Sequence, residues 1–285
     1  MPTPPAPPAH RQGAHRNRFD WGPAGAAAVA VGCDVAVVVD VLSFSTTLTV
    51  ALEAGAVVLP YPWDPAGAAA YAADHDATPA VGRSRARPGQ PSLSPLSLRA
   101  GAVPTRLVLP SPNGSALSFG LATGGSPHVA TGGSPHVATG GSPHVATGGS
   151  PLVVGACLRN ASAVARWIAS SGASTVAVIA AGERWPDGSL RPAVEDLWGA
   201  GAVLRAFAIA DPGGCSPESL SAAAAFDAAA PTIGALLDSC AGGRELAAKG
   251  FGGDVAVAAE VDVSAVVPVL RGIEFVDAAT EGDPA

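Results

Sequence analysis

The stretch VVVDVLSFSTT at 37–47 shows the plan that decides the fold, in which an apolar strand runs into a turn of small polar residues and then into a helix. Three later stretches repeat the plan: RLVLPSPNGSALS at 106–118, PLVVGACLRNASAVA at 151–165 and TVAVIAAGERWPDGSLRPAVEDLWGAGA at 175–202. Parallel strands covered on both faces read as such unbroken Val, Ile and Leu runs. Because open α/β sheets bind ligands beyond the carboxyl ends of their strands, the polar turns are the expected working surface.

This alternation predicts an α/β protein of three layers, α/β/α, around a largely parallel or mixed sheet, with an arrangement in two lobes as an alternative. At 285 residues the chain is long enough to bury a sizeable core. The predicted divisions are a disordered proline-rich tail at 1–21, an N-terminal α/β half at 22–121, an octapeptide-repeat insertion loop at 122–151, a C-terminal α/β half at 152–277 and a disordered tail at 278–285.

The insertion contains an eight-residue repeat. ATGGSPHV begins at three positions and a fourth copy reads ATGGSPLV, the four starting at Ala122, Ala130, Ala138 and Ala146. One interpretation is a metal-binding or solenoid strip made by the three evenly spaced histidines. The other is an expanded surface loop, which we favour because Gly-Gly and Ser-Pro in every copy oppose helices and weaken strands.

Charge and cysteine content narrow the class of partner and compartment. A formal net charge of -7 and a pI near 5.3 argue against a nucleic-acid-binding surface, which needs clustered Lys and Arg. Four widely spaced cysteines without a C-x-x-C pair fit a reducing cytoplasm. Apolar runs fall short of the ~18 residues expected of a membrane span. The expected partner is therefore a small molecule, without nucleic acid or membrane, and a homodimer is left open. An anionic substrate is compatible with this charge if a metal ion or a few local arginines reverse the field inside the cleft.

Asp40 is the polar residue within the otherwise apolar run VVVDVL. A carboxylate at the end of a buried strand is costly unless it is paired, hydrogen-bonded or bound to metal. It could simply cap its own turn, but its place at a strand end favours a functional role. Ser43, Ser45 and Thr46 follow and open a helix, whose free N–H groups suit phosphate or sulfonate oxygens if they do more than ordinary capping.

A second helix start is PSPNGS, where Asn113 and Gly114 tolerate left-handed backbone and Ser115 offers a hydroxyl. Further along, Glu195 and Asp196 lie in the first turn of another predicted helix. One interpretation is that these carboxylates only interact favourably with the helix dipole, which stabilises a helix by just ~0.3–1 kcal/mol.

Two glycine signals favour a larger role for this acidic pair. Gly182 ends the preceding strand, and the run GAGA at 199–202 lets the helix pack closely. The two carboxylates are then expected to approach Asp40 across a shared cleft, as an oxygen-rich site suited to Mg²⁺. The sequence lacks a P-loop and a G-x-G-x-x-G fingerprint, and its histidines are not placed for a serine–histidine triad.

Taken in order, DVLSFSTTLTVALEAGA, LPSPNGSAL, VVGACLRNASAVA and AAGERWPDGSLRPAVEDLWGAGA resemble the 2-phosphosulfolactate phosphatase, or ComB-like, family. The resemblance spans most of 34–269. It implies an α/β protein that uses Mg²⁺ to hydrolyse 2-phospho-3-sulfolactate to sulfolactate and phosphate, a step toward coenzyme M. It matches Asp40, Asn113-Gly114, Asn160 and the pair Glu195-Asp196 to the family's motifs.

The residue patterns and the resemblance together predict the site. The expected catalytic residues are Asp40, Glu195 and Asn113, and the expected metal ligands are Asp40, Glu195 and Asp196. The expected substrate-binding residues are Ser43, Ser45, Thr46, Gly114, Ser115, Arg159, Asn160 and Gly182.

The chain departs from the family pattern at three places. Ser43 stands where the family usually has arginine, Gly82-Arg83-Ser84 replaces Gly-Glu-Arg, and Leu93-Ser94-Pro95 replaces N-S-P. The expected anion pocket is thereby changed, and the arginines available to supply its charge are Arg83, Arg85, Arg87 and Arg159.

The favoured hypothesis is a cytoplasmic, Mg²⁺-dependent phosphatase of a small anionic phosphomonoester, similar to 2-phosphosulfolactate phosphatase. One alternative is a non-catalytic or repurposed relative that binds a small anion. Another keeps the carboxylates but makes the chain a metal-dependent lyase or isomerase of a hydroxy acid.

Overall fold

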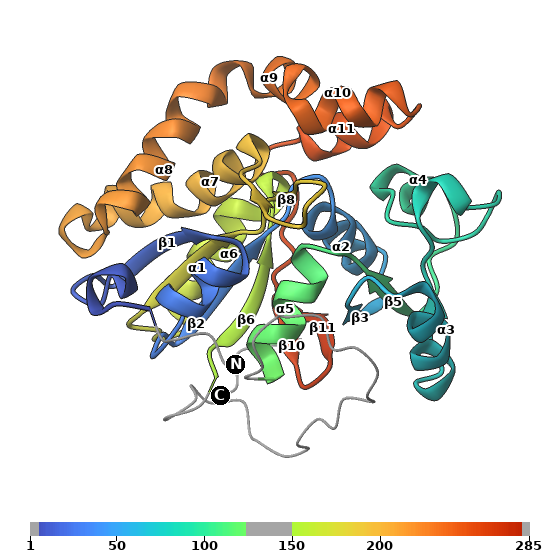
Figure 1. Ribbon diagram of the computed structural model, residues 1–285, viewed down its shortest axis with the longest axis horizontal. Helices are drawn as coiled ribbons and strands as arrows, with labels where there is room; N and C mark the ends of the chain where they lie inside the picture. Colours follow the sequence, from blue (N-terminus) through green and yellow to red (C-terminus); the bar gives the residue numbers. More distant parts are fainter. Residues whose placement is uncertain (1–5, 124–149, 281–285) are drawn as a thin grey trace.

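The computed structural model describes residues 6–123 and 150–280 (Figure 1). Within them, a mixed sheet has the strand order β1-β7-β2-β6-β10-β11-β3-β5-β4. Its strands are β1 (Asn17–Trp21), β2 (Val35–Val39), β3 (Val57–Tyr61), β4 (Thr78–Pro79), β5 (Arg106–Pro110), β6 (Leu152–Ala156), β7 (Val176–Ala180), β10 (Pro268–Arg271) and β11 (Glu274–Asp277). A two-stranded hairpin of β8 (Glu183–Arg184) and β9 (Leu190–Arg191) stands apart from it.

Helices connect these strands. They are α1 (Gly22–Val29), α2 (Phe44–Glu53), α3 (Pro65–Asp74), α4 (Pro95–Ala100), α5 (Gly114–Thr123), α6 (Ala161–Ser170), α7 (Val194–Ala210), α8 (Pro217–Ala229), α9 (Ile233–Ser239), α10 (Ala241–Ala248) and α11 (Gly252–Ala258). Short 3-10 turns are η1 (Pro8–Arg11), η2 (Arg83–Arg85), η3 (Leu158–Asn160), η4 (Pro212–Gly214) and η5 (Ala230–Thr232). Figure 1 shows α8 to α11 as an arc along the upper edge of the molecule, with α4 just below α11 and α3 at the lower right, beside β5.

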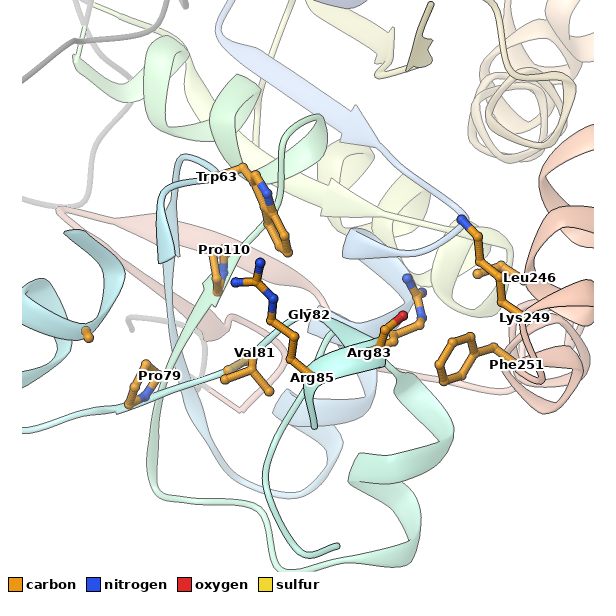
Figure 2. Close-up of a pocket in the computed structure, with 13 residues that line it drawn as sticks. Trp63, Pro79, Val81, Gly82, Arg83, Arg85, Pro110, Leu246, Lys249 and Phe251 are labelled. Carbon is orange, nitrogen blue, oxygen red and sulfur yellow. The ribbon is translucent and has the colours of Figure 1, made fainter. Parts of the chain in front are cut away.

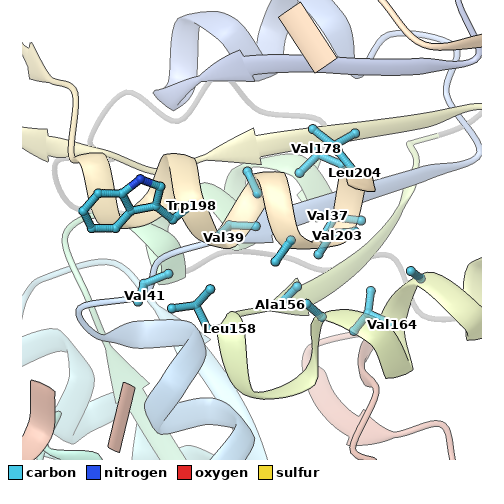
Figure 3. Close-up of a cluster of buried hydrophobic side chains, with 14 of the residues drawn as sticks. Val37, Val39, Val41, Ala156, Leu158, Val164, Val178, Trp198, Val203 and Leu204 are labelled. Carbon is cyan, nitrogen blue, oxygen red and sulfur yellow. The ribbon is translucent and has the colours of Figure 1, made fainter. Parts of the chain in front are cut away.

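β2 lies at the centre of the core because it has no polar side chain and pairs in parallel with β6 and β7. Its alternate residues face opposite layers, as the two-residue period of a strand requires. Val37 and Val39 pack with Val203 and Leu204 of α7 on one face (Figure 3). On the other face Ala36 and Val38 pack in a second cluster with residues of α1, α2 and α5. The predicted three-layer α/β fold is confirmed.

The two predicted halves both contribute strands to one sheet. β2 of the first half lies between β6 and β7 of the second. The antiparallel pair β10 and β11 then joins β6 to β3, which makes the sheet mixed. The run at 255–269 is divided between the end of α11 and the start of β10.

The prediction of a disordered tail over 1–21 is wrong for its last part. Asn17–Trp21 forms β1, an edge strand parallel to β7, and α1 follows it directly. The strand was missed because its sequence, NRFDW, has no apolar run, although its first three residues are all buried. The octapeptide insertion predicted at 122–151 lies almost wholly outside the described residues.

One described stretch, 217–239, has the length and a mean hydropathy of 1.4 that a membrane span would need. It comprises α8, η5 and α9, and α8 packs along α7 with Ala222 and Phe226 in the core. A core helix of a globular protein passes the same composition test, so this stretch is weak evidence for a membrane span.

Candidate functional site

Asp40 follows β2 directly and is the centre of the site, with only 4% of its surface exposed. Its Oδ1 accepts a hydrogen bond of 3.0 Å from the backbone N–H of Phe44, and its Oδ2 accepts one of 2.8 Å from the N–H of Gly114. The hydroxyl of Ser111 approaches the same Oδ2 at 3.5 Å. The starts of two helices, α2 and α5, therefore converge on this carboxylate, as expected where open α/β sheets bind ligands.

Gly114 is required by this convergence. A Cβ atom added there would lie 2.6 Å from Phe44 Cδ1 and 2.7 Å from Asp40 Cβ, well inside carbon–carbon contact distance. The glycine predicted to hold substrate thus has another role, which is to let the start of α5 reach Asp40 through its backbone N–H.

Asp196, in the first turn of α7, connects two strand ends. Its Oδ1 accepts a hydrogen bond of 2.7 Å from the N–H of Val41, and its Oδ2 accepts one of 2.9 Å from the N–H of Gly182. α7 can come this close because Gly199 has no side chain. A Cβ added to it would lie only 2.6 Å from a methyl group of Val41. The prediction that the small residues of α7 allow close packing beside Asp40 is confirmed.

Burial dominates the electrostatics of these two carboxylates. The pKa of Asp40 is raised from its ordinary value of 3.8 to about 6, first by burial and then by the nearby charge of Glu183, while the backbone hydrogen bonds lower it. Burial also raises the pKa of Asp196, with additional repulsion from Asp40 and Glu195. The site thus holds several acidic groups whose mutual repulsion a cation would relieve.

Glu183 is a site residue that the sequence reasoning missed. It begins the β8–β9 hairpin just after Gly182, and its Oε2 accepts a hydrogen bond of 2.9 Å from the side-chain amide of Asn113. Its charge acts on Asp40, so the predicted residue Asn113, Glu183 and Asp40 belong to one region. The available signal was its position, since it is a carboxylate immediately beyond a buried strand.

Glu195 does not face the site as its neighbour does. It is 2% exposed, and its carboxylate adjoins the start of α10 at Gly242 and Cys240. Burial raises its pKa. Successive residues on a helix point about 100° apart, so Asp196 and Glu195 cannot present their carboxylates in one direction.

The predicted trio of Asp40, Glu195 and Asp196 is therefore not gathered around one point. Over the described part of the chain, no group of three His, Cys, Asp or Glu side chains is placed to hold a metal ion. A site built on Asp40 would need ligands from outside the protein as well.

Several residues predicted to bind substrate are occupied within the fold. The hydroxyls of Ser45, Thr46 and Ser115 bond to backbone groups at the ends of β2 and β3. The side chain of Asn160 bonds to backbone N–H and C=O groups around the end of β6 and before β10. These contacts position the turns, and they leave substrate contact to other groups.

Arg159 is committed to a structural cluster. It is 2% exposed, and its guanidinium pairs with Glu53 at 2.8 Å and with Glu260. Its two carboxylate partners balance its charge, so its predicted role in substrate binding finds no support in these contacts.

Arg83 brings a positive charge to the site from the loop after β4. Its Nε donates to Asp254 Oδ2 at 2.7 Å and its Nη2 donates to Ser43 Oγ, while its charge lowers the pKa of Asp40. Asp254 is 1% exposed and also accepts from Ser94 Oγ at 2.5 Å. Arg83 was one of the arginines predicted to supply charge beside Ser43.

A cavity of about 410 Å³ adjoins this loop (Figure 2). Its lining includes Arg83, so one guanidinium joins the cavity to Ser43 and the Asp40 region. The cavity lies at the carboxyl ends of β4 and β5, because the last residues of these strands, Pro79 and Pro110, are part of its lining.

Comparison with known protein families gives a match to part of the chain. The family model described as 2-phosphosulpholactate phosphatase matches residues 142–272, just under half of the chain, and the matched part includes Gly182, Asp196 and Asp254. No curated protein matches the chain. The matched family consists of metal-dependent phosphatases. Together with the α/β fold and the acidic strand-end site, this match supports a ComB-like member of the 2-phosphosulfolactate phosphatase family, whose members are phosphomonoester hydrolases.

Proposed function

We propose that this protein is a cytoplasmic, Mg²⁺-dependent phosphatase that acts on a small anionic phosphomonoester. The observation that carries the proposal is the convergence on Asp40 of two helix starts, with Arg83 close by. Helix starts favour negative charge, and an arginine fork matches phosphate oxygens, so this region suits a phosphoryl group. All four cysteines are buried and unpaired, which fits a reducing compartment.

The carboxylates of the site fit a magnesium ion that takes only part of its ligands from the protein. Mg²⁺ usually keeps several waters and takes one or two carboxylates together with substrate phosphate oxygens. Oδ1 of Asp40 accepts one hydrogen bond, from the Phe44 N–H, which leaves lone-pair capacity on that atom, whereas Oδ2 accepts from the Gly114 N–H and from the Ser111 hydroxyl. Asp40 would hold the ion with Glu183 as a second carboxylate, and Asp196 would hold the two strand ends in place. A bound ion would polarise the phosphoryl group and orient water.

The protein's own groups supply the rest of the chemistry. Phosphoryl transfer depends mostly on positioning and on stabilising negative charge over the equatorial oxygens. Arg83 is held by Asp254 and reaches Ser43, so its guanidinium is fixed where those oxygens would lie. Asn113 holds Glu183 in orientation through its amide.

Phosphate release from small anionic phosphomonoesters, with Mg²⁺ and with a chelator, tests this function. We expect Mg²⁺-dependent turnover that falls at least a hundredfold in Asp40→Asn, a loss of about 2.7 kcal/mol in transition-state stabilisation. The matched control is Asp34→Asn at the opposite end of β2, where the carboxylate bonds to Ser174 and Thr175. That variant should lose stability and keep turnover per folded molecule. Near-normal turnover of Asp40→Asn would refute the assignment.

The second candidate is a small-anion-binding protein without turnover. The observation in its favour is that Arg83 is already engaged by Asp254 and Ser43, so it could hold an anion without taking part in chemistry. Inorganic phosphate or sulfate would then raise the melting temperature, while no phosphomonoester would release phosphate.

A further inference from the structure

The cavity beside Arg83 has a lining that small phosphomonoesters do not require. Its volume of about 410 Å³ falls in the range of roughly 300–1,000 Å³ in which proteins enclose small organic ligands. Its walls are largely apolar, with Trp63 at one side and Phe251 at the other (Figure 2). Val81, Pro110 and Leu246 extend the apolar surface between them. Such walls favour a flat apolar body over a short polar acid.

Three cationic side chains also line the cavity, and they come from two segments of the chain. Arg83 and Arg85 belong to the loop after β4, and Lys249 follows α10. In Figure 2 the guanidinium of Arg85 extends toward Trp63 and Pro110, while Arg83 lies on the side of Phe251. The lining contains no acidic residue, so its own side chains carry a net positive charge in a protein whose net charge is -7.

The present partners of these cations leave charge available to a ligand. Lys249 pairs with Glu245 at 2.5 Å, but both side chains are more than half exposed, and such surface pairs contribute little. Arg85 is exposed and has no ion-pair partner among the described residues. Arg83 is held by Asp254, which fixes its position at the boundary between the cavity and Ser43.

We propose that this cavity binds an organic anion with a flat, aromatic-sized apolar body, which lies between Trp63 and Phe251 while its carboxylate or sulfonate meets Arg85 and Lys249. The substrate class that follows rests on the proposed phosphatase function. It is an aryl-type phosphomonoester that carries a further anionic group. Arg83 joins the cavity to the phosphate end of the site. The cavity is thus the specificity-determining part of the binding surface.

A fluorescent aromatic sulfonate, 8-anilinonaphthalene-1-sulfonate, tests binding without any need for turnover. We expect saturable binding by the folded protein, with the dissociation constant raised at least fivefold in Trp63→Ala and in Arg85→Gln. The probe without its sulfonate, 1-anilinonaphthalene, should bind at least fivefold more weakly to the natural chain. Both variants change partly exposed side chains, so thermal melts should show folded protein.

Matched controls are Ile209→Ala, which removes a 71% exposed apolar side chain, and Arg205→Gln, which removes an exposed arginine paired with Asp227. These controls should bind the probe as the natural chain does. Equal dissociation constants in cavity variants and controls, or a lack of saturable binding, would overturn the inference whatever the enzymatic result.

A kinetic measurement then connects the cavity to the reaction. The ratio of kcat/KM for 4-carboxyphenyl phosphate to kcat/KM for methyl phosphate should exceed tenfold and fall at least fivefold in Arg85→Gln. A ratio near one, with measurable turnover of both compounds, would overturn the substrate class and leave the phosphatase function standing. Saturable, cavity-dependent binding without turnover of either compound would instead refute the phosphatase function and support the cavity as a binding site.

Discussion

Gly114→Ala is the substitution that tests most directly how the site is built. The added Cβ would lie 2.6 Å from Phe44 Cδ1, 2.7 Å from Asp40 Cβ and 2.8 Å from Asp40 Oδ2. Carbon atoms in contact lie about 3.5–4.0 Å apart, so the start of α5 and Asp40 must separate by about 1 Å. Overpacking of this kind costs about 1–3 kcal/mol. A displacement of about 1 Å at a reacting group can reduce turnover about a hundredfold.

Two assays on the same preparation separate these effects. Urea denaturation followed by circular dichroism should show the loss of stability, and phosphate release should show the loss of turnover in molecules that remain folded. The control is Gly234→Ala in α9, where a Cβ meets nothing within 4 Å. That variant should be neutral or more stable by about 0.5–1 kcal/mol, because alanine favours a helix over glycine. If Gly114→Ala is as stable and active as the natural chain, Asp40 does not depend on the close approach of α5.

Two further predictions concern charge. Arg83→Gln leaves the buried Asp254 without its cation and should lower the free energy of unfolding by about 3–5 kcal/mol, with partial recovery in the double variant with Asp254→Asn. The control is Arg205→Gln, which removes an exposed pair with Asp227 and should lower the free energy of unfolding by less than about 1 kcal/mol in urea denaturation. Equal losses for the two arginine variants would show that the buried pair of Arg83 with Asp254 is no more important than an exposed one. The pKa of Asp40 in the folded protein, about 6, lies above its ordinary value of 3.8, so protonated Asp40 stabilises the fold. This contribution is fully present below pH 3.8 and is lost as the pH rises through 6, which lowers the free energy of unfolding by an amount on the order of 3 kcal/mol. In the proposed function, Mg²⁺ is held by the ionised carboxylate of Asp40, so Mg²⁺ should raise the melting temperature more at about pH 7.5 than at about pH 5. An equal rise at both pH values, or the same pH dependence in Asp40→Asn, would contradict this role of Asp40.

Local sequence signals predicted the parts of the fold that depend on neighbouring residues. The apolar run of β2 predicted a strand buried on both faces, and Asp40 at its end is where two helix starts meet. The small residues near the start of α7 predicted that this helix packs closely on the sheet. The contact of Gly199 with Val39 and Val41 confirms it. In each case a period or a turn signal lies within a few residues of the feature it predicts.

Contacts between distant segments were beyond such signals. Arg83 reaches Ser43 and Asp254, which are 40 and 171 residues away in the chain, and their meeting depends on how α11 packs beside the loop after β4. The direction of Glu195 was likewise set by tertiary packing, because α7 presents Asp196 to β2 and so turns Glu195 toward α10. β1 depends on pairing with β7, a strand about 160 residues later.

The arrangement of charge around the site has a consequence for how a substrate would be oriented. Asp40, Glu183 and Asp196 gather negative charge at the ends of β2 and β7, whereas Arg83, Arg85 and Lys249 place positive charge around the cavity. Arg83 lies at the boundary, bonded to Ser43 on one side and lining the cavity on the other. A multiply charged anion would therefore be repelled by the acidic side until a cation is bound there, and would enter with its anionic tail in the cavity. Cation binding and substrate binding should accordingly reinforce one another, because each lowers the electrostatic cost of the other.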